Sequence, residues 1–352
     1  MEQERIEIRS LTLEELTALM EELGEKRFRA KQLYQWLHVH RAASYEEMTN
    51  LPKSLLAKLA ERTSLTVLRQ ETVQVSGLDG TRKYLFALPD GNLIESVLMR
   101  YQHGNSVCIS SQAGCRMGCR FCASAIGGLV RGLTAAEMAA EVYRIGRETG
   151  ERRAPGVVMG TGEALDNYDN LLRFLALLTD ENGLHISQRN ITVSTCGIVP
   201  RIRQLADERL SITLAISLHA ATQEKRRELM PVADRYGLPE LMEACRYYFD
   251  RTGRRVTFEY SLVAGVNDSD ADAKELAGLL SGMNCHVNLI PVNPVKERAY
   301  SQPDRGRILD FKNKLEKYGI NVTIRREMGQ DIDGACGQLR KRYLGSVDPG
   351  LH

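Results

Sequence analysis

The chain lacks a long apolar run: nothing in its 352 residues approaches the length of a membrane span. Such a span needs about 18 apolar residues in succession. The first residues, Met-Glu-Gln-Glu-Arg, also lack the basic and apolar regions of a signal peptide. No internal repeat and no low-complexity tract is present. These absences argue against a membrane-bound or exported protein. With 43% hydrophobic and 26% charged residues, we expect a soluble, globular, cytoplasmic chain.

A strong charge of one sign is also missing, since the net charge is only +2. This average does not predict nucleic-acid binding, but a phosphate backbone is bound by a local patch rather than by an average. For any single basic residue, a solvated helix face is an equally good interpretation. The residues that could form such a patch are Lys26, Arg27, Arg29, Lys31, Arg325, Arg326, Arg340, Lys341 and Arg342.

Eight cysteines in a chain without export signals fit a reducing compartment, where thiols serve metals and catalysis. Three of them, Cys115, Cys119 and Cys122, form a CxxxCxxC triplet with no fourth cysteine close by. A closed [4Fe–4S] site takes four cysteines, so three leave one iron open to another ligand. The alternatives are a zinc site or three buried thiols. Zinc usually takes paired CxxC units from two places, which makes it the weaker reading.

Two patterns divide the chain. Residues 11–62 predict three short amphipathic helices, and residues 65–100 predict strands broken by turn signals at 77–80 and 89–91. From Val107 onward, strand and helix patterns alternate, which predicts parallel strands with crossover helices. The predicted strands are Val107–Ser110, Gly156–Met159, Asn190–Ser194, Ile212–Leu218, Val256–Val263, His286–Pro291 and Asn321–Arg325. The predicted crossover helices include Ala135–Arg147, Leu171–Leu178, Pro239–Asp250, Ala271–Leu280 and Arg307–Lys317.

This alternation predicts an α/β fold, a partial (β/α)6-type barrel with a helical N-terminal region and a short β linker. We expect an accessory domain at 1–64, a β-rich linker at 65–104, the barrel at 105–330 and a C-terminal segment at 331–352. In such barrels, chemistry takes place at the C-terminal ends of the strands.

Small and polar groups follow several of the predicted strands. Gly162 and Glu163 follow one strand, where the glycine permits close backbone approach and the carboxylate could hold an amine, although a plain turn explains them equally well. The other strand-end candidates are Thr195-Cys196-Gly197, His219 and Asn293. Together these groups suit a nucleoside-like cofactor.

Two further cysteines stand out. Cys336 lies between small residues in Asp331-Ile332-Asp333-Gly334-Ala335-Cys336-Gly337-Gln338-Leu339, a setting open to close approach. Cys108 lies on the first predicted barrel strand, seven residues before the triplet. A buried, structural thiol is the alternative for both, and more strongly for Cys108. Cys196, Cys245 and Cys285 are expected to be structural.

Over nearly its whole length the chain resembles the RlmN/Cfr family of radical S-adenosylmethionine (SAM) adenosine methyltransferases. The residues that carry the resemblance include the Ser106–Gln112 strand, the triplet with Phe121-Cys122-Ala123-Ser124, Gly162-Glu163-Ala164-Leu165, Ser194–Gly197, Ile216–His219, Leu229-Met230-Pro231, Gly265–Asp268 and Asp331–Leu339. RlmN-type members methylate C2 of an adenosine in the peptidyl transferase centre of 23S rRNA, and some also methylate a tRNA adenosine beside the anticodon. Cfr-type members methylate C8 of the same rRNA base and confer antibiotic resistance.

The resemblance implies one [4Fe–4S] cluster held by Cys115, Cys119 and Cys122, and SAM bound by Gly162, Glu163, Ser194, Ser217, Leu218, His219 and Asn293. It implies that Cys336 takes a methyl group from one SAM. A second SAM yields the radical that activates this methyl group for addition to the base. Cys108 then helps to remove the ring proton and forms a disulfide with Cys336, with Glu95 as a proton acceptor. For Glu95 a solvated strand carboxylate is the alternative. The implied partners are 23S rRNA, tRNA in some members, and an electron donor such as flavodoxin or ferredoxin.

The chain departs from the RlmN pattern at a few positions. Ala164 follows Glu163 where RlmN-type members usually have proline, as in Cfr-type members, whereas the loop Cys122–Leu129 is of the RlmN type. Gly334 and Thr161 replace the usual alanine and methionine. C2 chemistry is therefore favoured, with C8 methylation as the alternative. A different class, a non-catalytic Fe–S RNA-binding protein, predicts that Cys336 is dispensable. Methylthiolation needs a second cluster, for which no second triplet is present.

Overall fold

The computed structural model describes residues 5–101, 104–150, 156–293, 295 and 299–347. The described residues do not include 1–4, on which the expectation about a signal peptide largely depends. They also do not include 348–352, at the end of the predicted C-terminal segment. Within the described part, no helix has the length and apolar composition of a membrane span.

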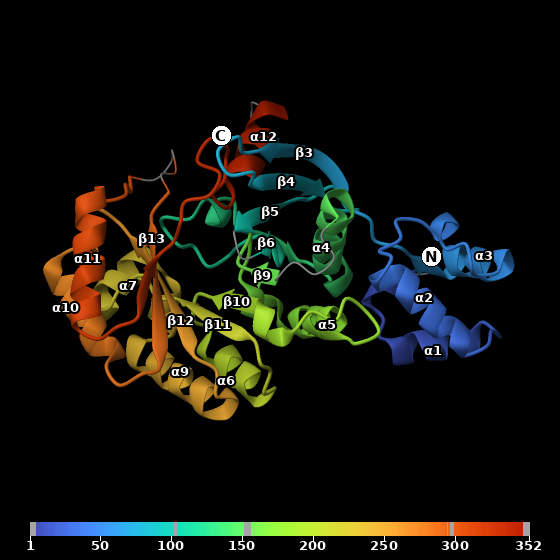
Figure 1. Ribbon diagram of the computed structural model, residues 1–352, viewed down its shortest axis with the longest axis horizontal. Helices are drawn as coiled ribbons and strands as arrows, with labels where there is room; N and C mark the ends of the chain where they lie inside the picture. The colour runs from blue at the N-terminus through green and yellow to red at the C-terminus, as the bar shows by residue number, and fades with distance from the viewer. Residues whose placement is uncertain (1–4, 102–103, 151–155, 294, 296–298, 348–352) are drawn as a thin grey trace.

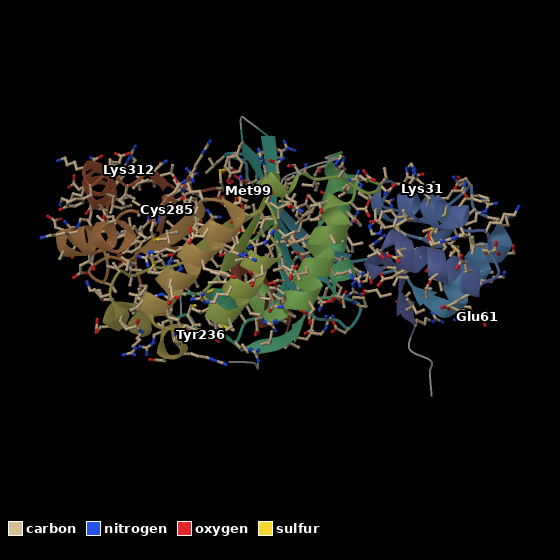
Figure 2. The ribbon with its side chains drawn as sticks, turned by 90° about the horizontal axis from the view of Figure 1, so that it is seen from below. Lys31, Glu61, Met99, Tyr236, Cys285 and Lys312 are labelled. Carbon is tan, nitrogen blue, oxygen red and sulfur yellow. The ribbon has the colours of Figure 1, made fainter. Side chains whose placement is uncertain are left out.

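Three helices form a lobe at one end of the molecule (Figures 1 and 2): α1 (Leu13–Glu22), α2 (Phe28–His38) and α3 (Lys53–Arg62). Helix α1 begins with a capping box, in which the Thr12 hydroxyl accepts from Glu15 N and the Glu15 carboxylate accepts from Thr12 N. A short parallel strand pair, β1 (Ile6–Glu7) with β2 (Thr63–Ser64), joins the two ends of this segment. The three helices predicted between residues 11 and 62 are confirmed.

A ten-stranded sheet runs through the middle of the molecule, in the order β14-β13-β12-β11-β10-β9-β6-β5-β4-β3. Strands β6 to β14 of this sheet are parallel, as the alternation of strand and helix patterns predicted, and they form the partial barrel. Their bounds are β6 (Gly104–Ile109), β9 (Gly156–Val158), β10 (Ile191–Thr195), β11 (Thr213–Ser217), β12 (Val256–Leu262), β13 (Cys285–Pro291) and β14 (Val322–Ile324).

The three remaining strands come from the segment predicted to be a β-rich linker. Strands β3 (Arg69–Val75), β4 (Arg82–Ala87) and β5 (Leu93–Tyr101) are antiparallel, and β5 pairs with β6. They therefore extend the barrel sheet rather than merely connecting two domains. In Figure 1 they form a platform over which the C-terminal segment lies.

Helices connect successive parallel strands of the sheet, as crossover connections require. They are α4 (Ala135–Thr149), α5 (Tyr168–Thr179), α6 (Val199–Asp207), α9 (Leu238–Thr252), α10 (Asp270–Leu280) and α11 (Arg305–Lys317). Elements that were not named from the sequence are α6, the strands β1 and β2, α7 (Gln223–Leu229), α8 (Val232–Arg235), α12 (Gln338–Val347) and a small hairpin of β7 (Gln112–Gly114) with β8 (Leu129–Gly132). The 3-10 turns are Ile8–Ser10, Tyr45–Glu47, Ala123–Ala125, Ala164–Asn167 and Gln188–Asn190.

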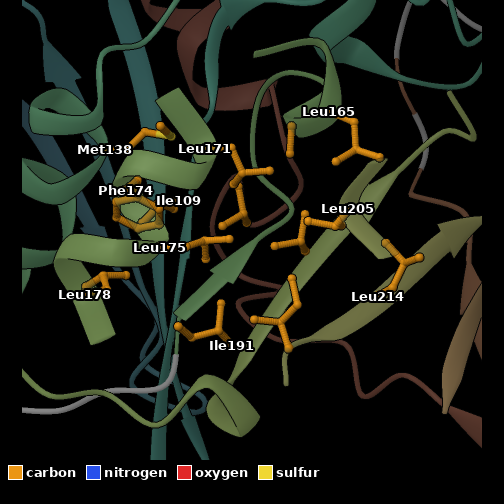
Figure 3. Packing of buried hydrophobic residues seen from close by; sticks show 14 of the residues in the cluster. Ile109, Met138, Leu165, Leu171, Phe174, Leu175, Leu178, Ile191, Leu205 and Leu214 are labelled. Atoms are coloured by element: carbon orange, nitrogen blue, oxygen red, sulfur yellow. The ribbon is translucent and has the colours of Figure 1, made fainter. Parts of the chain in front are cut away.

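Apolar side chains of α4 and α5 pack against the strands to form the core next to the site. Leu171, Phe174 and Leu175 on α5 point toward Ile109 at the end of β6 and Ile191 at the start of β10 (Figure 3). All five side chains are buried. Burial of such a side chain contributes about 1.5–3 kcal/mol, so this layer holds the strand ends that carry the site residues.

Replacement of Leu171 by alanine is expected to lower the free energy of unfolding by about 2–5 kcal/mol, because the buried side chain leaves a cavity. Leu78→Ala is the matched control, since Leu78 is 71% exposed; its effect should stay within about 0.5 kcal/mol. Chemical denaturation followed by circular dichroism measures both. Equal effects of the two substitutions would contradict this assignment of the core.

Candidate active site

The cysteine triplet lies on a loop that the β7–β8 hairpin closes. Cys115 N donates to Gly128 O over 2.9 Å, which ties the first cysteine to the far end of the loop. Gly114 has a φ of 81°, and a Cβ there would lie 2.1 Å from Gly128 O. Only glycine permits both this conformation and this approach. The hairpin therefore fixes the position of the loop relative to β6.

One cavity of about 240 Å³ brings most of the predicted site residues together. Its lining includes all three cysteines of the triplet, and also Gly162, Glu163, Ser194, Ser217, His219, Asn293 and Cys336. These residues come from the C-terminal ends of neighbouring strands and from the C-terminal segment. Leu218 is different, because it is fully buried and packs into the core, while its backbone N–H donates to Glu259 O.

The donor set of this cavity fits an iron–sulfur cluster. Three thiols from one loop share the cavity, and burial raises the pKa of Cys115 to about 12 and raises the pKa of Cys119 and Cys122 as well. Buried thiols of this kind become thiolates when they bind iron, with release of their protons. Among the described residues, no group of three His, Cys, Asp or Glu side chains is arranged to hold a single metal ion.

Other polar groups that line the cavity are held in place by backbone hydrogen bonds. The Glu163 carboxylate accepts from Cys196 N over 2.7 Å and from Leu165 N over 3.2 Å, and burial raises its pKa. His219 Nδ1 accepts from Ser261 N over 2.9 Å, which leaves Nε2 as the other polar atom of the ring. Burial lowers the His219 pKa to about 3, so this ring is neutral. The arrangement suits a zwitterionic ligand with an amine and a nucleoside.

Cys336 lies where this cavity meets a second one of about 260 Å³. Cys108 lines the second cavity, and the Cys108 and Cys336 thiols are hydrogen-bonded to each other. Both cysteines are free. The hydrogen bond from Cys108, helped by the charge of Lys83, lowers the Cys336 pKa to about 6, while the same hydrogen bond and burial raise the pKa of Cys108. At neutral pH, Cys336 is therefore the thiolate of the pair.

The Cys336 segment packs directly on the cluster loop. Gly337 has a φ of 81°, and a Cβ there would lie 2.7 Å from Ser124 N. This close contact joins the C-terminal segment to the residues that follow Cys122. Glu95, by contrast, lies on β5 outside the lining of both cavities, where its carboxylate accepts from Gly337 N and Arg340 N.

Several residues at the site were not assigned to it from the sequence. Arg325, predicted only as part of a basic patch, lines both cavities, and Glu259 in the middle of β12 lines the first. Lys83 is fully buried within the apolar strand β4. Arg226 on α7 is buried too, and its Nη2 donates to Cys196 O over 2.6 Å. A charged residue inside an apolar strand or on a buried helix face was the available signal for Lys83, Glu259 and Arg226.

Comparisons with known proteins agree with this fold and site. Residues 6–65 match the family model described as the ribosomal RNA large subunit methyltransferase N-terminal domain, and residues 109–277 match the radical SAM superfamily. A crystal structure of a radical SAM methyltransferase from Sphaerobacter thermophilus superposes with a TM-score of 0.90 at 46% identity, covering 95% of this chain and 98% of that one.

Curated relatives extend over almost the entire chain. A protein of Lachnospira eligens named probable dual-specificity RNA methyltransferase RlmN is 61% identical over 342 residues, which is 97% of this chain and 98% of the relative. A protein of the same name from Lachnoclostridium phytofermentans is 61% identical over 340 residues, 97% of this chain and 96% of the relative.

Fold, cysteine loop and structural neighbour together define a radical SAM methyltransferase. Identity to full-length relatives narrows this class further. The chain belongs to the RlmN family.

Alkylation of the thiols tests the electrostatics of the cysteine pair. The reactive form is the thiolate, so the rate for Cys336 should rise with pH through about 6 and level off near neutrality, because its pKa is lowered to about 6. Cys108 should stay slow over the same range, because its pKa is raised. Peptide mass spectrometry after timed iodoacetamide exposure measures both rates. A Cys336 rate that rises only above pH 8 or so, as for an ordinary thiol, would contradict the lowered pKa.

Proposed function

We propose that this protein methylates C2 of an adenosine in the peptidyl transferase centre of 23S rRNA, and of a tRNA adenosine beside the anticodon, through a methyl group carried on Cys336. The observation that carries the proposal is the position of Cys336, between a cavity lined by the cysteine triplet and a cavity lined by Cys108. The dual-specificity name of the relatives supports two RNA substrates.

The target atom explains why two cysteines are needed. The C2–H bond of adenine is too weakly acidic for simple removal of a proton. The carbon is also electrophilic, so it does not attack the methyl group of a sulfonium. A methyl group held on a protein sulfur and activated as a radical avoids both obstacles.

Cys336 performs the first step in this proposal. Its thiolate attacks the methyl carbon of SAM, a sulfur–carbon bond forms on Cys336, and S-adenosylhomocysteine leaves with the electron pair of the broken bond. The lowered Cys336 pKa supports this role, since the thiolate is the nucleophile.

The proposed cofactor site would hold one [4Fe–4S] cluster on Cys115, Cys119 and Cys122, and SAM on the cavity-lining residues Gly162, Glu163, Ser194, Ser217, His219 and Asn293. When bound, this pair supplies a carbon radical that removes a hydrogen atom from the methyl group on Cys336. The buried Glu163 is suited to hold the SAM amine, and the neutral His219 ring is suited to contact the adenosine moiety.

Cys108 performs the release step. After the carbon on Cys336 has joined C2, loss of the C2 proton to Cys108 and of one electron, for which the bound cluster would be the acceptor, restores the aromatic ring. Cys108 then gives this proton up to solvent and attacks the Cys336 sulfur as a thiolate, a disulfide forms, and the sulfur–carbon bond breaks with its electron pair. The released carbon takes a proton and becomes the methyl group. The hydrogen bond between the two thiols supports this pairing. An external thiol reductant resets the disulfide.

RNA binding is assigned in this proposal to the N-terminal lobe and the mouth of the Cys108 cavity. The family description of residues 6–65 supports the first assignment. Arg325, Arg326, Gln330 and Gln338 line the second cavity and offer donors to an extruded base. An acidic redox protein such as flavodoxin or ferredoxin is the proposed source of electrons.

Replacement of Cys336 by alanine is expected to abolish methyl transfer to RNA, because no other side chain then carries the methyl group. Cys285→Ala is the control, since Cys285 is also a buried cysteine but lies on β13 outside both cavities, so its loss should leave activity within about twofold. Transfer of radiolabel from SAM to RNA measures both. Full activity of Cys336→Ala would contradict transfer through Cys336, whereas no transfer by the unmodified protein would favour the reading as a non-catalytic Fe–S RNA-binding protein.

Replacement of Cys108 by alanine is expected to trap the base on Cys336, because the disulfide that releases the product cannot form. Protein purified from cells should then carry covalently bound RNA, detected by nuclease digestion and mass spectrometry of the Cys336 peptide. Cys108→Ala protein free of RNA would overturn the role given to Cys108. A Cys108→Ala, Cys336→Ala double variant should carry none in either case.

A further inference from the structure

A fully buried ion pair lies beneath the Cys336 segment. Lys83 Nζ on β4 is 2.8 Å from Glu95 Oε2 on β5, and the two side chains are 0% and 2% exposed. The register of β4 and β5 brings the two side chains together, because Lys83 lies opposite Val97 and Glu95 lies opposite Leu85. Lys83 and Glu95 are therefore diagonal neighbours on the same face of the sheet. Val97 in turn pairs with Cys108, so that face also carries the second cysteine of the proposed reaction.

The ion pair contacts the backbone on both sides of Cys336. Lys83 Nζ donates to Ala335 O over 2.8 Å, and Glu95 Oε2 accepts from Gly337 N over 2.6 Å. Glu95 Oε1 accepts from Arg340 N over 2.7 Å, at the first turn of α12. The N–H groups of a first helical turn have no partner within the helix, so the carboxylate stabilises the start of α12.

The rest of the C-terminal segment is attached to the same strands. Asp331 accepts from Ser76 Oγ and Gly77 N, and Asp333 exchanges two hydrogen bonds with Gln74. On its other side, Gly337 contacts the backbone at Ser124. The segment is therefore fixed between the β3–β5 strands and the cluster loop, with the ion pair at the centre of the contact.

We propose that Lys83 and Glu95 act together as a clamp that sets the position of the Cys336 sulfur between the two cavities. Lys83 is then a positioning residue, and Glu95 contributes through the same clamp. The effect of the clamp on methyl transfer rests on the proposed function of Cys336, whereas the existence of the clamp does not.

The geometry favours this role of Glu95 over that of a proton acceptor. Its Oε2 is shared by Lys83 and Gly337, and its Oε1 is bound by Arg340 N. Glu95 is also not among the described residues that line either cavity, so it has no contact with the space offered to the base. Cys108, which lines one of them, is better placed to take the ring proton.

The decisive variants are Lys83→Met, Glu95→Gln and the double variant. Removal of one partner leaves an uncompensated buried charge, whereas removal of both leaves none, so the double variant should fold at least as well as Lys83→Met. Lys58→Met is the matched control, because Lys58 forms an ion pair with Glu25 away from the site.

The rate of amide hydrogen exchange in peptides that contain Gly337 and Arg340 tests the clamp without any enzymatic turnover. In all three clamp variants, the amide hydrogens of these peptides should exchange at least about tenfold faster, as expected when a hydrogen bond to a charged group is lost. In Lys58→Met their exchange rate should stay unchanged. Unchanged exchange in every clamp variant, with melting temperatures retained, would overturn the clamp.

Methyl loading of Cys336, measured by peptide mass spectrometry, reads the consequence. Each single variant should load more slowly than the unmodified protein, and the double variant should be no slower than the slower single variant, because the two residues act as one unit. Normal loading in Glu95→Gln, together with accumulation of the RNA adduct, would instead make Glu95 the proton acceptor and overturn its positioning role. If Cys336 of the unmodified protein takes up no methyl group, the proposed function is refuted, but the hydrogen-exchange test of the clamp is unaffected.

Discussion

The contact between the C-terminal segment and the cysteine loop is the constraint on which the structure depends. Gly337 approaches the backbone at Ser124, and the Cys336 thiol reaches Cys108 on β6. The cysteine loop, the Cys336 thiol and the Cys108 thiol lie around two adjoining cavities, although they come from distant parts of the chain. The β7–β8 hairpin, the barrel strands and the β3–β5 strands each hold one of these parts in place.

The surroundings of the thiols separate their pKa values into two groups. The pKa of each triplet cysteine is raised by burial, which suits groups that lose their protons only to iron. Cys336 has a lowered pKa because Cys108 donates to it and Lys83 is near, so it is a nucleophile without any metal. The same hydrogen bond and burial raise the pKa of Cys108, which is therefore the protonated thiol of the pair. One hydrogen bond thus separates the acidities of the two thiols.

Local patterns predicted the barrel and most of its site. Alternation of strand and helix patterns located strands such as β10 and β12, and polar residues that follow strand ends, His219 and Asn293 among them, do line the cavity. The continuation of the sheet through β3–β5 was not predicted, because pairing of β5 with β6 leaves no local signal. Lys83 is marked as a charged residue within an apolar strand, but its partners Glu95 and Ala335 could not be predicted, because they are set by sheet register and by a distant segment. Leu218, named from resemblance alone, is buried in the core.

The account is tested most directly by the methyl group of the product. The protein would be supplied with SAM whose methyl hydrogens are all deuterium, and adenosines from the treated 23S rRNA and tRNA would be examined by mass spectrometry against 2-methyl and 8-methyl standards. Passage through Cys336 removes one deuterium as an atom and adds one proton from water at release. The account therefore predicts 2-methyladenosine that retains two of the three deuterium atoms. An 8-methyl product would contradict the C2 assignment, and retention of all three would contradict transfer through a methylene on Cys336.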